Sequence, residues 1–301
     1  MNIIKYRYIW YITSAILIGA SLFALLTFGL KQGIDFAGGS LLSVRYEDGN
    51  RPTAMEAQQI LSSADLGGMV VQPVGETDMN FRLRTLKEDE HQKVLGTLRE
   101  NYGEITELRF DSIGPVIGQE LRSKSITALI IVFIAILIFI GYTFRKVSIP
   151  VASWKYGLVT VFAAFHDVII PVGVFAILGK YFGIEIGTSF IAAILTVMGY
   201  SINDTIVVFD RIRENLQKTS GTFVEIVNIS LNQTILRSIN TSLTTILALT
   251  AVYFFGGESI RDFALTLIIG IIAGTYSSIF IASPLLVTIY KYQQKMKARK
   301  A

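Results

Sequence analysis

The sequence predicts a polytopic α-helical membrane protein with six transmembrane helices and one soluble α+β domain between the first two helices. Hydrophobic residues make up 51% of the 301-residue chain and charged residues only 17%, with a mean hydropathy of +0.52. This composition is typical of polytopic membrane proteins. Six apolar stretches approach or exceed the roughly 20 residues that a helix needs to cross a bilayer. The long polar segment after the first stretch carries mixed strand and helix patterns.

The apolar stretches lie at Ile9–Leu30, Ile126–Phe144, Tyr156–Leu178, Ile186–Phe209, Ile239–Phe255 and Phe263–Tyr290. The fifth is short and rich in serine and threonine, and a start near Thr234 would bring Arg237 into the membrane. The first follows Lys5 and Arg7 as a signal sequence would, but it is too long for a typical signal peptide and no Ala-x-Ala cleavage site follows. We therefore expect an uncleaved first span.

Lysine and arginine beside the spans predict the orientation, because positively charged loops stay in the cytoplasm. The short loops of one side carry only Lys180 and Arg261. The other side carries fourteen such residues: Lys5, Arg7, Arg145, Lys146, Lys155, Arg211, Arg213, Lys218, Arg237, Lys291, Lys295, Lys297, Arg299 and Lys300. Both termini are thus expected in the cytoplasm. The expected segments are 1–30 (N-terminus and first helix), 31–125 (soluble domain), 126–290 (five helices) and 291–301 (basic tail).

The soluble segment, residues 31–125, is expected on the extracytoplasmic (periplasmic) side. It holds 15 acidic and 11 basic residues, which do not disturb the topology because translocated domains are largely exempt from the positive-inside rule. Its pattern predicts, in order, a strand Ser40–Tyr46, a helix Thr53–Ser63, strands Met69–Val74 and Asn80–Arg84, a helix Glu88–Tyr102 and a strand Ile105–Ile113, with Arg51-Pro52, Gly67-Gly68 and Gly103 at helix boundaries. This βαββαβ order predicts a ferredoxin-like fold.

Several classes of function lack support in the sequence. The chain has no cysteine and only two histidines, so neither disulfides nor an ordinary zinc site are expected. The net charge of +4 comes from basic residues beside apolar spans, which indicates membrane topology and not nucleic-acid binding. No serine-hydrolase, phosphate-loop or HExxH signature occurs. We expect no enzyme, cofactor or metal site.

An ionisable residue inside the fourth span, Asp204, is the first candidate for function. A charge at that depth costs from about 3 to over 10 kcal/mol, and such residues usually face a bundle interior or carry protons or ions. Asn203 and Ser201 share its stretch, and Gly199 would permit close approach of another helix. At about 1.5 Å per residue, Asp204 lies roughly 10 Å inside Arg211, which should mark the cytoplasmic edge.

Two further polar groups are candidates. Arg237 opens the fifth span from the same edge, and we hypothesise that it reaches Asp204 directly, through Asn240 or through water. The alternative is that Arg237 is an interfacial arginine whose charged end extends to the membrane surface. His166-Asp167, five residues before Pro171, interrupts the third span. The pair either packs as a satisfied polar pair between helices or carries protons, as a histidine beside a carboxylate can.

Two segments together resemble the SecF family of the bacterial protein-export machinery. They are Gly33-Ile-Asp-Phe-Ala-Gly-Gly after the first span and Gly199-Tyr-Ser-Ile-Asn-Asp-Thr-Ile-Val-Val-Phe-Asp-Arg-Ile-Arg-Glu in the fourth. The first resembles a tight turn more than a phosphate loop, because Gly33, Gly38 and Gly39 lack the GxGxxG and Walker spacings. Three further segments are similar to the family: Gly114-Pro-Val-Ile-Gly-Gln-Glu-Leu, His166-Asp167 and Arg237-Ser-Ile-Asn-Thr-Ser-Leu-Thr-Thr. The family more often has threonine at the position of Ser238.

The resemblance implies a subunit that works with SecD, is related to RND transporters, and uses the proton motive force to promote preprotein translocation through SecYEG. It also implies a position in the inner membrane, with protons, unfolded preprotein, membrane lipids and YajC as further partners. Asp204 would be the proton-responsive carboxylate and Arg237 its partner, with Asn203, His166 and Asp167 as secondary residues. Gly33, Asp35, Gly38, Gly39, Gly199 and Asn240 would belong to structural motifs. The alternatives are a proton-coupled RND-type exporter of small molecules or lipids, and a passive scaffold whose polar residues each hold helices together by about 1 kcal/mol.

Overall fold

The computed structural model describes residues 2–47, 51–62, 69–145 and 150–299, and the chain divides into two compact units. One unit comprises Met1–Lys31 and Thr127–Ala301, and the other Gln32–Ile126. Parts of the predictions above, namely Ser63, Gly67-Gly68, Lys146 and Lys300, lie outside the described residues.

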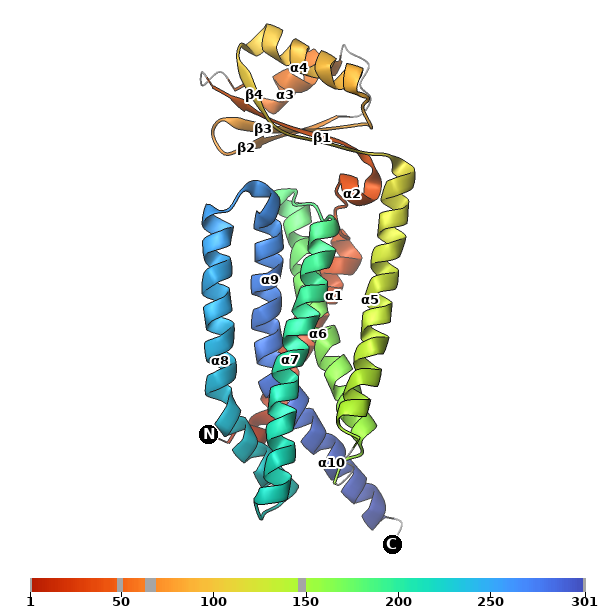
Figure 1. The fold of residues 1–301 in the computed structure, drawn as a ribbon, viewed down its shortest axis with the longest axis vertical. Helices are drawn as coiled ribbons and strands as arrows, with labels where there is room; N and C mark the ends of the chain where they lie inside the picture. The colour runs from red at the N-terminus through yellow and green to blue at the C-terminus, as the bar shows by residue number, and fades with distance from the viewer. Residues whose placement is uncertain (1, 48–50, 63–68, 146–149, 300–301) are drawn as a thin grey trace. The chain divides into compact units, whose positions relative to one another are not determined.

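Within the described residues, six helices are long and apolar enough to cross a membrane, as expected (Figure 1). The first five contain α1 (Arg7–Phe28, after the short helix η1, Ile4–Tyr6), α5 (Pro115–Thr143), α6 (Ser153–Phe182), α7 (Thr188–Lys218) and α8 (Phe223–Phe255). The sixth consists of α9 (Glu258–Ser277), a π-helical turn η2 (Ser278–Ala282) and α10 (Ser283–Ala298).

The fifth span begins much earlier than the expected Ile239. Helix α8 starts at Phe223, where Thr222 caps it: its hydroxyl accepts from the Glu225 N–H over 3.3 Å, and the Glu225 carboxylate accepts from the Thr222 N–H over 2.8 Å. A capping box satisfies two backbone donors that a helix start leaves unpaired. Because this polar first part is helical, apolarity alone misplaced the start, and Arg237 lies well inside α8.

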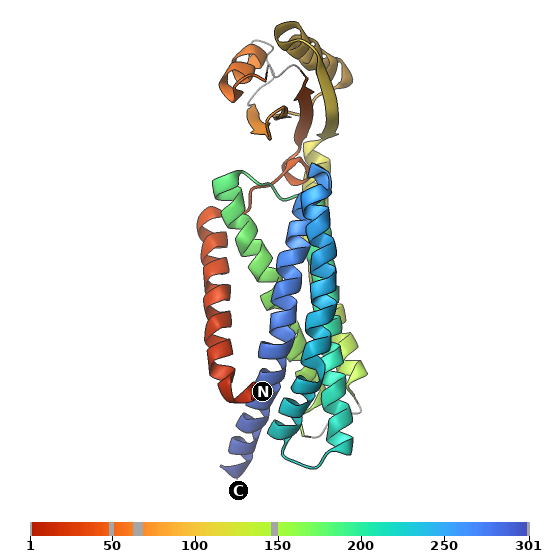
Figure 2. The same cartoon turned by 90° about the vertical axis from the view of Figure 1, so that its left-hand side faces the viewer.

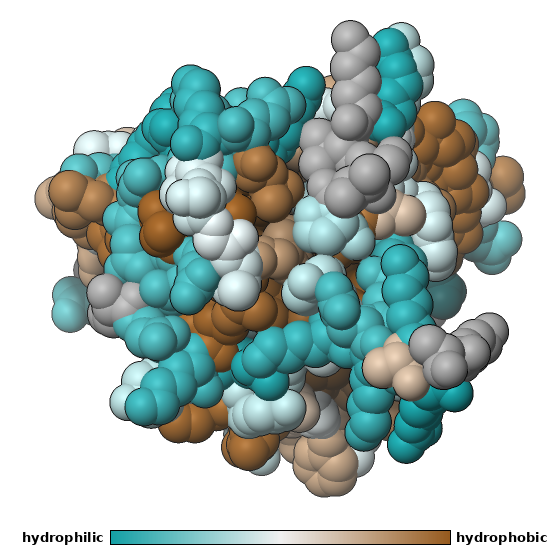
Figure 3. Space-filling view, turned by 90° about the horizontal axis from the view of Figure 1, so that it is seen from below, coloured by the Kyte–Doolittle hydropathy of each residue, from teal (hydrophilic) through white to brown (hydrophobic). Residues whose placement is uncertain are grey.

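Aromatic side chains pack together near one end of the transmembrane unit. The rings of Phe144 and Tyr156 stack at 5.4 Å, Phe209 lies edge-on to Tyr156 at 5.2 Å, and Phe223 meets Tyr290 at 4.9 Å. These contacts join the end of α5 to the start of α6 and the start of α8 to the middle of α10, and the first and last described residues lie at this end in two views (Figures 1 and 2). Hydrophilic side chains gather over this end of the molecule, with apolar ones between and around them (Figure 3).

Small residues let α9 lie close to α7. A Cβ added at Gly270 would overlap the Val197 side chain, and one at Gly274 would lie 2.8 Å from the Ser201 Cβ. By contrast, a Cβ added at Gly199 would meet open space. The close approach expected at Gly199 is therefore absent among the described residues, because α9 packs on the opposite face of α7.

The soluble unit contains every expected strand and helix. It consists of α2 (Ile34–Ala37), β1 (Gly39–Tyr46), α3 (Ala54–Ser62), β2 (Val70–Val74), β3 (Asp78–Leu83), α4 (Glu88–Tyr102) and β4 (Ile105–Ile113). The antiparallel sheet has the order β2-β3-β1-β4, with Ser40 paired to both Leu83 and Ser112. Alternate residues of β3, Met79, Phe81 and Leu83, are buried against the two helices α3 and α4, which cover one face (Figure 1).

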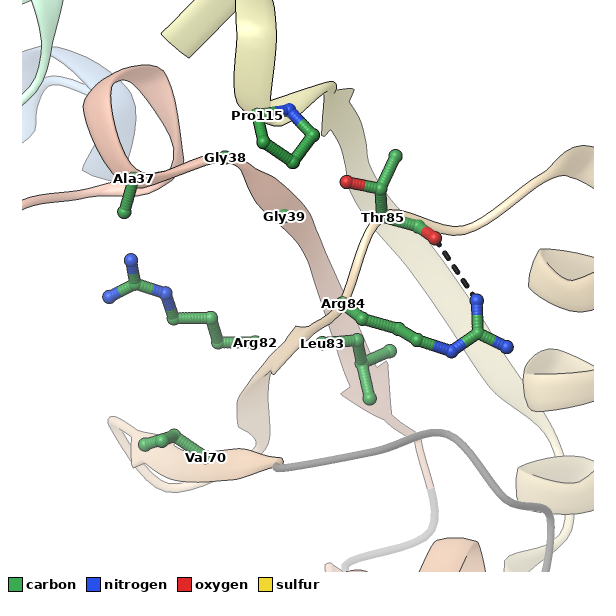
Figure 4. Close-up of a pocket in the computed structure, with 9 residues that line it drawn as sticks. All are labelled: Ala37, Gly38, Gly39, Val70, Arg82, Leu83, Arg84, Thr85 and Pro115. Atoms are coloured by element: carbon green, nitrogen blue, oxygen red, sulfur yellow. Dashed lines mark hydrogen bonds between the residues drawn. The ribbon is translucent and has the colours of Figure 1, made fainter. Parts of the chain in front are cut away.

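Gly38 and Gly39 form the turn between α2 and β1. Their φ angles are +75° and +123°, which side-chain-bearing residues rarely adopt. A Cβ at Gly38 would lie 2.8 Å from the Cα of Pro115, and one at Gly39 would lie 2.8 Å from the Leu83 carbonyl oxygen (Figure 4). The expected tight turn is present, preceded by the single helical turn α2.

Replacing Gly38 with alanine should loosen β1. The strained φ angle and the Pro115 contact together should cost about 1–3 kcal/mol. Hydrogen exchange of the full chain should then be faster at the β1 amides. Gly96→Ala is the control, because Gly96 lies within α4 with open space around its Cα and alanine favours helix. Equal exchange of β1 in both variants would contradict this account of the turn.

Candidate functional site

The Asp204 carboxylate lies in the interior of the transmembrane unit, with only 7% of the residue exposed. Its Oδ1 accepts a hydrogen bond from the Ser238 hydroxyl of α8 over 2.5 Å, and its Oδ2 accepts one from the Ser278 hydroxyl of η2. Helices α7, α8 and the sixth span thus meet at this one side chain. Satisfied hydrogen bonds are what a buried carboxylate requires.

One side of Asp204 opens on a cavity of about 350 Å³ between α7 and α8. All but one of its lining residues have polar side chains: Tyr200, Asn203, Asp204, Val207, Arg237, Thr241, Thr244 and Thr245. The cavity brings together three of the expected site residues, Asp204, Asn203 and Arg237.

Asp204 and Arg237 share this cavity without an ion pair. Among the described residues, no arginine or lysine nitrogen lies within 4.0 Å of the Asp204 carboxylate. The expected direct contact is therefore replaced by the shorter Ser238 side chain, the residue after Arg237. Asn240 is exposed on α8 and does not line the cavity, so it does not bridge the two groups.

His166 and Asp167 form a second, fully buried polar group on α6. His166 Nδ1 lies 2.9 Å from Asp167 Oδ1. Asp167 Oδ2 accepts from the Ser277 hydroxyl over 2.7 Å and from the Ser201 hydroxyl. His166 Nε2 is buried and has no hydrogen-bond partner among the described residues. Because a buried N–H without an acceptor is costly, this pattern favours a neutral ring with its proton on Nδ1.

The two carboxylates are chemically suited to hold protons. Each is held by hydroxyl donors in a site from which bulk water is largely excluded, where a change of charge strongly affects the neighbouring contacts. Asp204 also faces a polar cavity through which a proton can arrive. Asp167 is fully buried and accepts a hydrogen bond from His166, whose second ring nitrogen has no partner among the described residues.

Sequence reasoning missed the serines that hold these carboxylates. Ser201 was noted as a polar neighbour of Asp204 but donates to Asp167, and Ser238 was noted only as a departure from the family pattern. Ser277-Ser278 was overlooked in the apolar sixth span. Two adjacent hydroxyls at that depth could have been found by asking which donors a buried carboxylate needs.

A second cavity, of about 380 Å³, lies in the soluble unit beside the glycine turn (Figure 4). Its two arginines already bind elsewhere: Arg82 donates to the Gln32 carbonyl over 2.8 Å, and Arg84 pairs with Glu90 over 2.5 Å. Asp35 lies in the neighbouring helix α2, and Gly33 precedes it. In the described part of the chain, no group of three or more histidine, aspartate or glutamate side chains could hold a metal ion.

Most of the chain matches a known protein family. Residues 93–292 match the family described as "Protein export membrane protein SecD/SecF, C-terminal". The chain belongs to the SecD/SecF family. Residues 23–49, which include the glycine turn, match the SecD/SecF GG motif.

Individual SecF relatives match almost the whole chain. "Protein translocase subunit SecF" of Thermobaculum terrenum is 44% identical and aligns over 96% of this chain and 93% of its own length. The subunit of the same name from Sebaldella termitidis is 38% identical, over 100% and 95%. These matches confirm the expected family, and with the six spans they identify a SecF-like, multi-pass membrane subunit of Sec protein translocation.

Two solved structures share the fold. The crystal structure of SecDF, a translocon-associated membrane protein from Thermus thermophilus, aligns over 97% of this chain with a TM-score of 0.83 and 32% identity. SecDF in a super-membrane-facing form aligns over 100% with a TM-score of 0.71, also at 32% identity. The SecF-like chain spans about two fifths of each SecDF chain, 39% and 40% respectively. This proportion supports SecD as the partner that supplies the remainder.

Proposed function

We propose that this SecF-like subunit uses the proton motive force, together with SecD, to promote preprotein translocation through SecYEG. Asp204 binds and releases the proton. The observation that carries the proposal is the position of its carboxylate, which is buried among three spans yet opens on a polar cavity that contains Arg237. A proton that crosses 100 mV supplies about 2.3 kcal/mol, enough to shift a helix contact of ordinary strength.

The other expected residues take supporting roles in this proposal. Arg237 and Asn203 tune the field and hydration of the cavity, and His166-Asp167 forms a second proton-responsive group. Gly33, Asp35, Gly38 and Gly39 shape the connection from the first span to the soluble unit. Gly199 and Asn240, which are exposed on α7 and α8, are available to helices of a partner subunit.

We place the end of the bundle that carries both termini in the cytoplasm and the chain in the inner membrane. The segments would be residues 1–30, 31–125, 126–290 and 291–301, as the charge distribution predicts. The soluble domain is then periplasmic. Its βαββαβ order and the strand order β2-β3-β1-β4 support a ferredoxin-like fold. There it would handle the emerging unfolded preprotein, and YajC and membrane lipids would be further partners.

The test measures preprotein translocation into inverted membrane vesicles that contain or lack this subunit, with and without a protonophore. The expected result is that the subunit increases translocation only while a proton gradient is present, and that SecD co-purifies with it. The same vesicles should be assayed for proton-driven export of lipids and small molecules. An unchanged preprotein rate, together with such export, would replace the proposal with the RND-type exporter, which no contact in the site favours at present.

A further inference from the structure

Two adjacent serines of the sixth span each bind a different buried carboxylate. Ser277, the last residue of α9, donates to Asp167 of α6 over 2.7 Å. Ser278, the first residue of η2, donates to Asp204 of α7. Successive helical residues point about 100° apart, so this short segment can reach two neighbouring helices at once. The sixth span is thereby tied to both candidate proton sites.

These two hydroxyls have alternative acceptors in their own helix. The Ser277 hydroxyl lies 3.1 Å from the Gly274 carbonyl oxygen. The Ser278 hydroxyl lies 3.2 Å from the Thr275 carbonyl oxygen. Serine in a helix commonly bonds back to the preceding turn in this way. Each hydroxyl can therefore leave its carboxylate without losing all hydrogen bonding.

The competing donors to the same carboxylates are placed differently. Ser201 of α7 donates to Asp167, and Ser238 of α8 donates to Asp204. Among the described residues, neither of these two hydroxyls has a second acceptor. If either carboxylate loses an acceptor site, the two donors to it are unequal, because only the donor from the sixth span already lies within hydrogen-bond distance of a second acceptor, whereas the other donor would first have to rotate.

Protonation of a carboxylate removes such an acceptor site, because one oxygen becomes a donor. A buried hydroxyl left without an acceptor costs about 1–3 kcal/mol. The least costly response at Asp204 is that Ser238 keeps its bond and Ser278 turns to Thr275. The same reasoning at Asp167 releases Ser277 and keeps Ser201.

The released serines lie where the sixth span is least regular. Residues Ser278–Ala282 form a π-helical turn, and Pro284 just beyond it lacks the N–H that would bond to the carbonyl four residues earlier. Such turns occur often at functional sites and can revert to α-helix with a local shift. A contact at this turn can therefore control the position of α10 relative to α7.

We propose that Ser277 and Ser278 are positioning residues that report the protonation of Asp167 and Asp204 to the sixth span. This inference rests on the proposed function, since it takes Asp204 as the proton-responsive group. The other titratable and charged groups near the two carboxylates are Arg237 of α8 and Tyr200 of α7 in the cavity, His166 of α6 beside Asp167, and Tyr276 of α9, whose ring lies 5.9 Å from that of His166.

The natural absence of cysteine allows a direct test. Spin labels attached to Gln217→Cys at the end of α7 and Tyr292→Cys on α10, both exposed, report the distance between these helices in the reconstituted complex with its partners. The distance is measured in four backgrounds: unchanged, Asp204→Asn, Ser278→Ala and both together. Thr266→Val is the matched control, because Thr266 is fully buried in α9 of the same span and, among the described residues, its hydroxyl bonds only to the Asp262 carbonyl, over 2.7 Å.

Asp204→Asn mimics the protonated acid by keeping one acceptor oxygen. We expect it to shift the distance by about 1–2 Å, the size of an ordinary helix shift, and Ser278→Ala to produce the same shift. The double variant should show no further change, and Thr266→Val should show no shift. Ser278→Ala should also weaken gradient-dependent translocation, and Ser278→Thr should restore it by returning the hydroxyl.

Two other outcomes separate the hypotheses. If Ser278→Ala behaves like Thr266→Val while Asp204→Asn abolishes gradient dependence, the serine inference is wrong and the proposed function stands. If Asp204→Asn leaves gradient dependence intact, the proposed function itself fails. Shifts that add in the double variant would also overturn the inference, because Ser278 would then act independently of Asp204.

Discussion

Vesicles that carry Asp204→Asn should lose the gradient-dependent part of preprotein translocation and fall to the rate seen with a protonophore. Asparagine has nearly the same shape, and its carbonyl oxygen can still accept one of the two serine hydrogen bonds at this position. The fold should therefore be kept while the titratable group is lost. A driving force of about 2.3 kcal/mol per proton at 100 mV corresponds to roughly a fiftyfold bias, which sets the largest effect to expect.

Asp210→Asn is the matched control for this experiment. It makes the same chemical change on the same helix, but Asp210 is exposed and pairs with Arg213 only at 3.8 Å. Exposed pairs of this kind contribute little to stability. Translocation should keep its full response to the gradient in this variant. An Asp204→Asn complex that assembles normally and responds like the Asp210→Asn complex would exclude Asp204 as the coupling residue.

The sequence predicted most of the fold because strong local patterns determine it. Long apolar stretches indicate membrane helices almost independently of their neighbours, since every backbone group must be bonded within the helix. In the soluble unit, strand and helix periods change at glycine and proline, and the strand Ile105–Ile113 was placed with the bounds observed. The start of α8 was predicted too late because hydropathy identifies only the apolar part of a helix. The helix itself extends beyond the apolar stretch, to its cap at Thr222.

The candidate site was predictable only in part, because its contacts join distant segments. An aspartate in an apolar helix can be identified from the sequence because burying its charge costs free energy. Arg237 was identified from the motif of α8 that contains it. Which side chain reaches the carboxylate depends on helix rotation, which a sequence does not show. The rotation of α8 directs Ser238 and not Arg237 at Asp204, and the π-turn directs Ser278 at it from 74 residues away.

Replacing Arg237 with alanine should reduce gradient-dependent translocation at least tenfold, while Arg237→Lys should retain part of it. The guanidinium lines the same cavity as Asp204, where its positive charge acts on the carboxylate across a short distance. Lysine keeps the charge but lacks the planar set of donors. Arg213→Ala removes a comparable charge near the end of α7, outside the cavity, and should leave the response to the gradient unchanged.

Combining Arg237→Ala with Asp204→Asn determines whether the two residues act together despite the absence of an ion pair. If Arg237 works through the charge of Asp204, the double variant should be no worse than Asp204→Asn alone, because the group on which the arginine acts is already gone. Residues that share a site usually show such non-additivity, of about 0.5–3 kcal/mol. The reference is the effect of Arg237→Ala on gradient-dependent translocation in the Asp210→Asn background. If Arg237→Ala has the same effect in the Asp204→Asn background, the two residues act independently, and Arg237 is an arginine of the membrane interface. In that case the two side chains would line the same cavity without acting on each other.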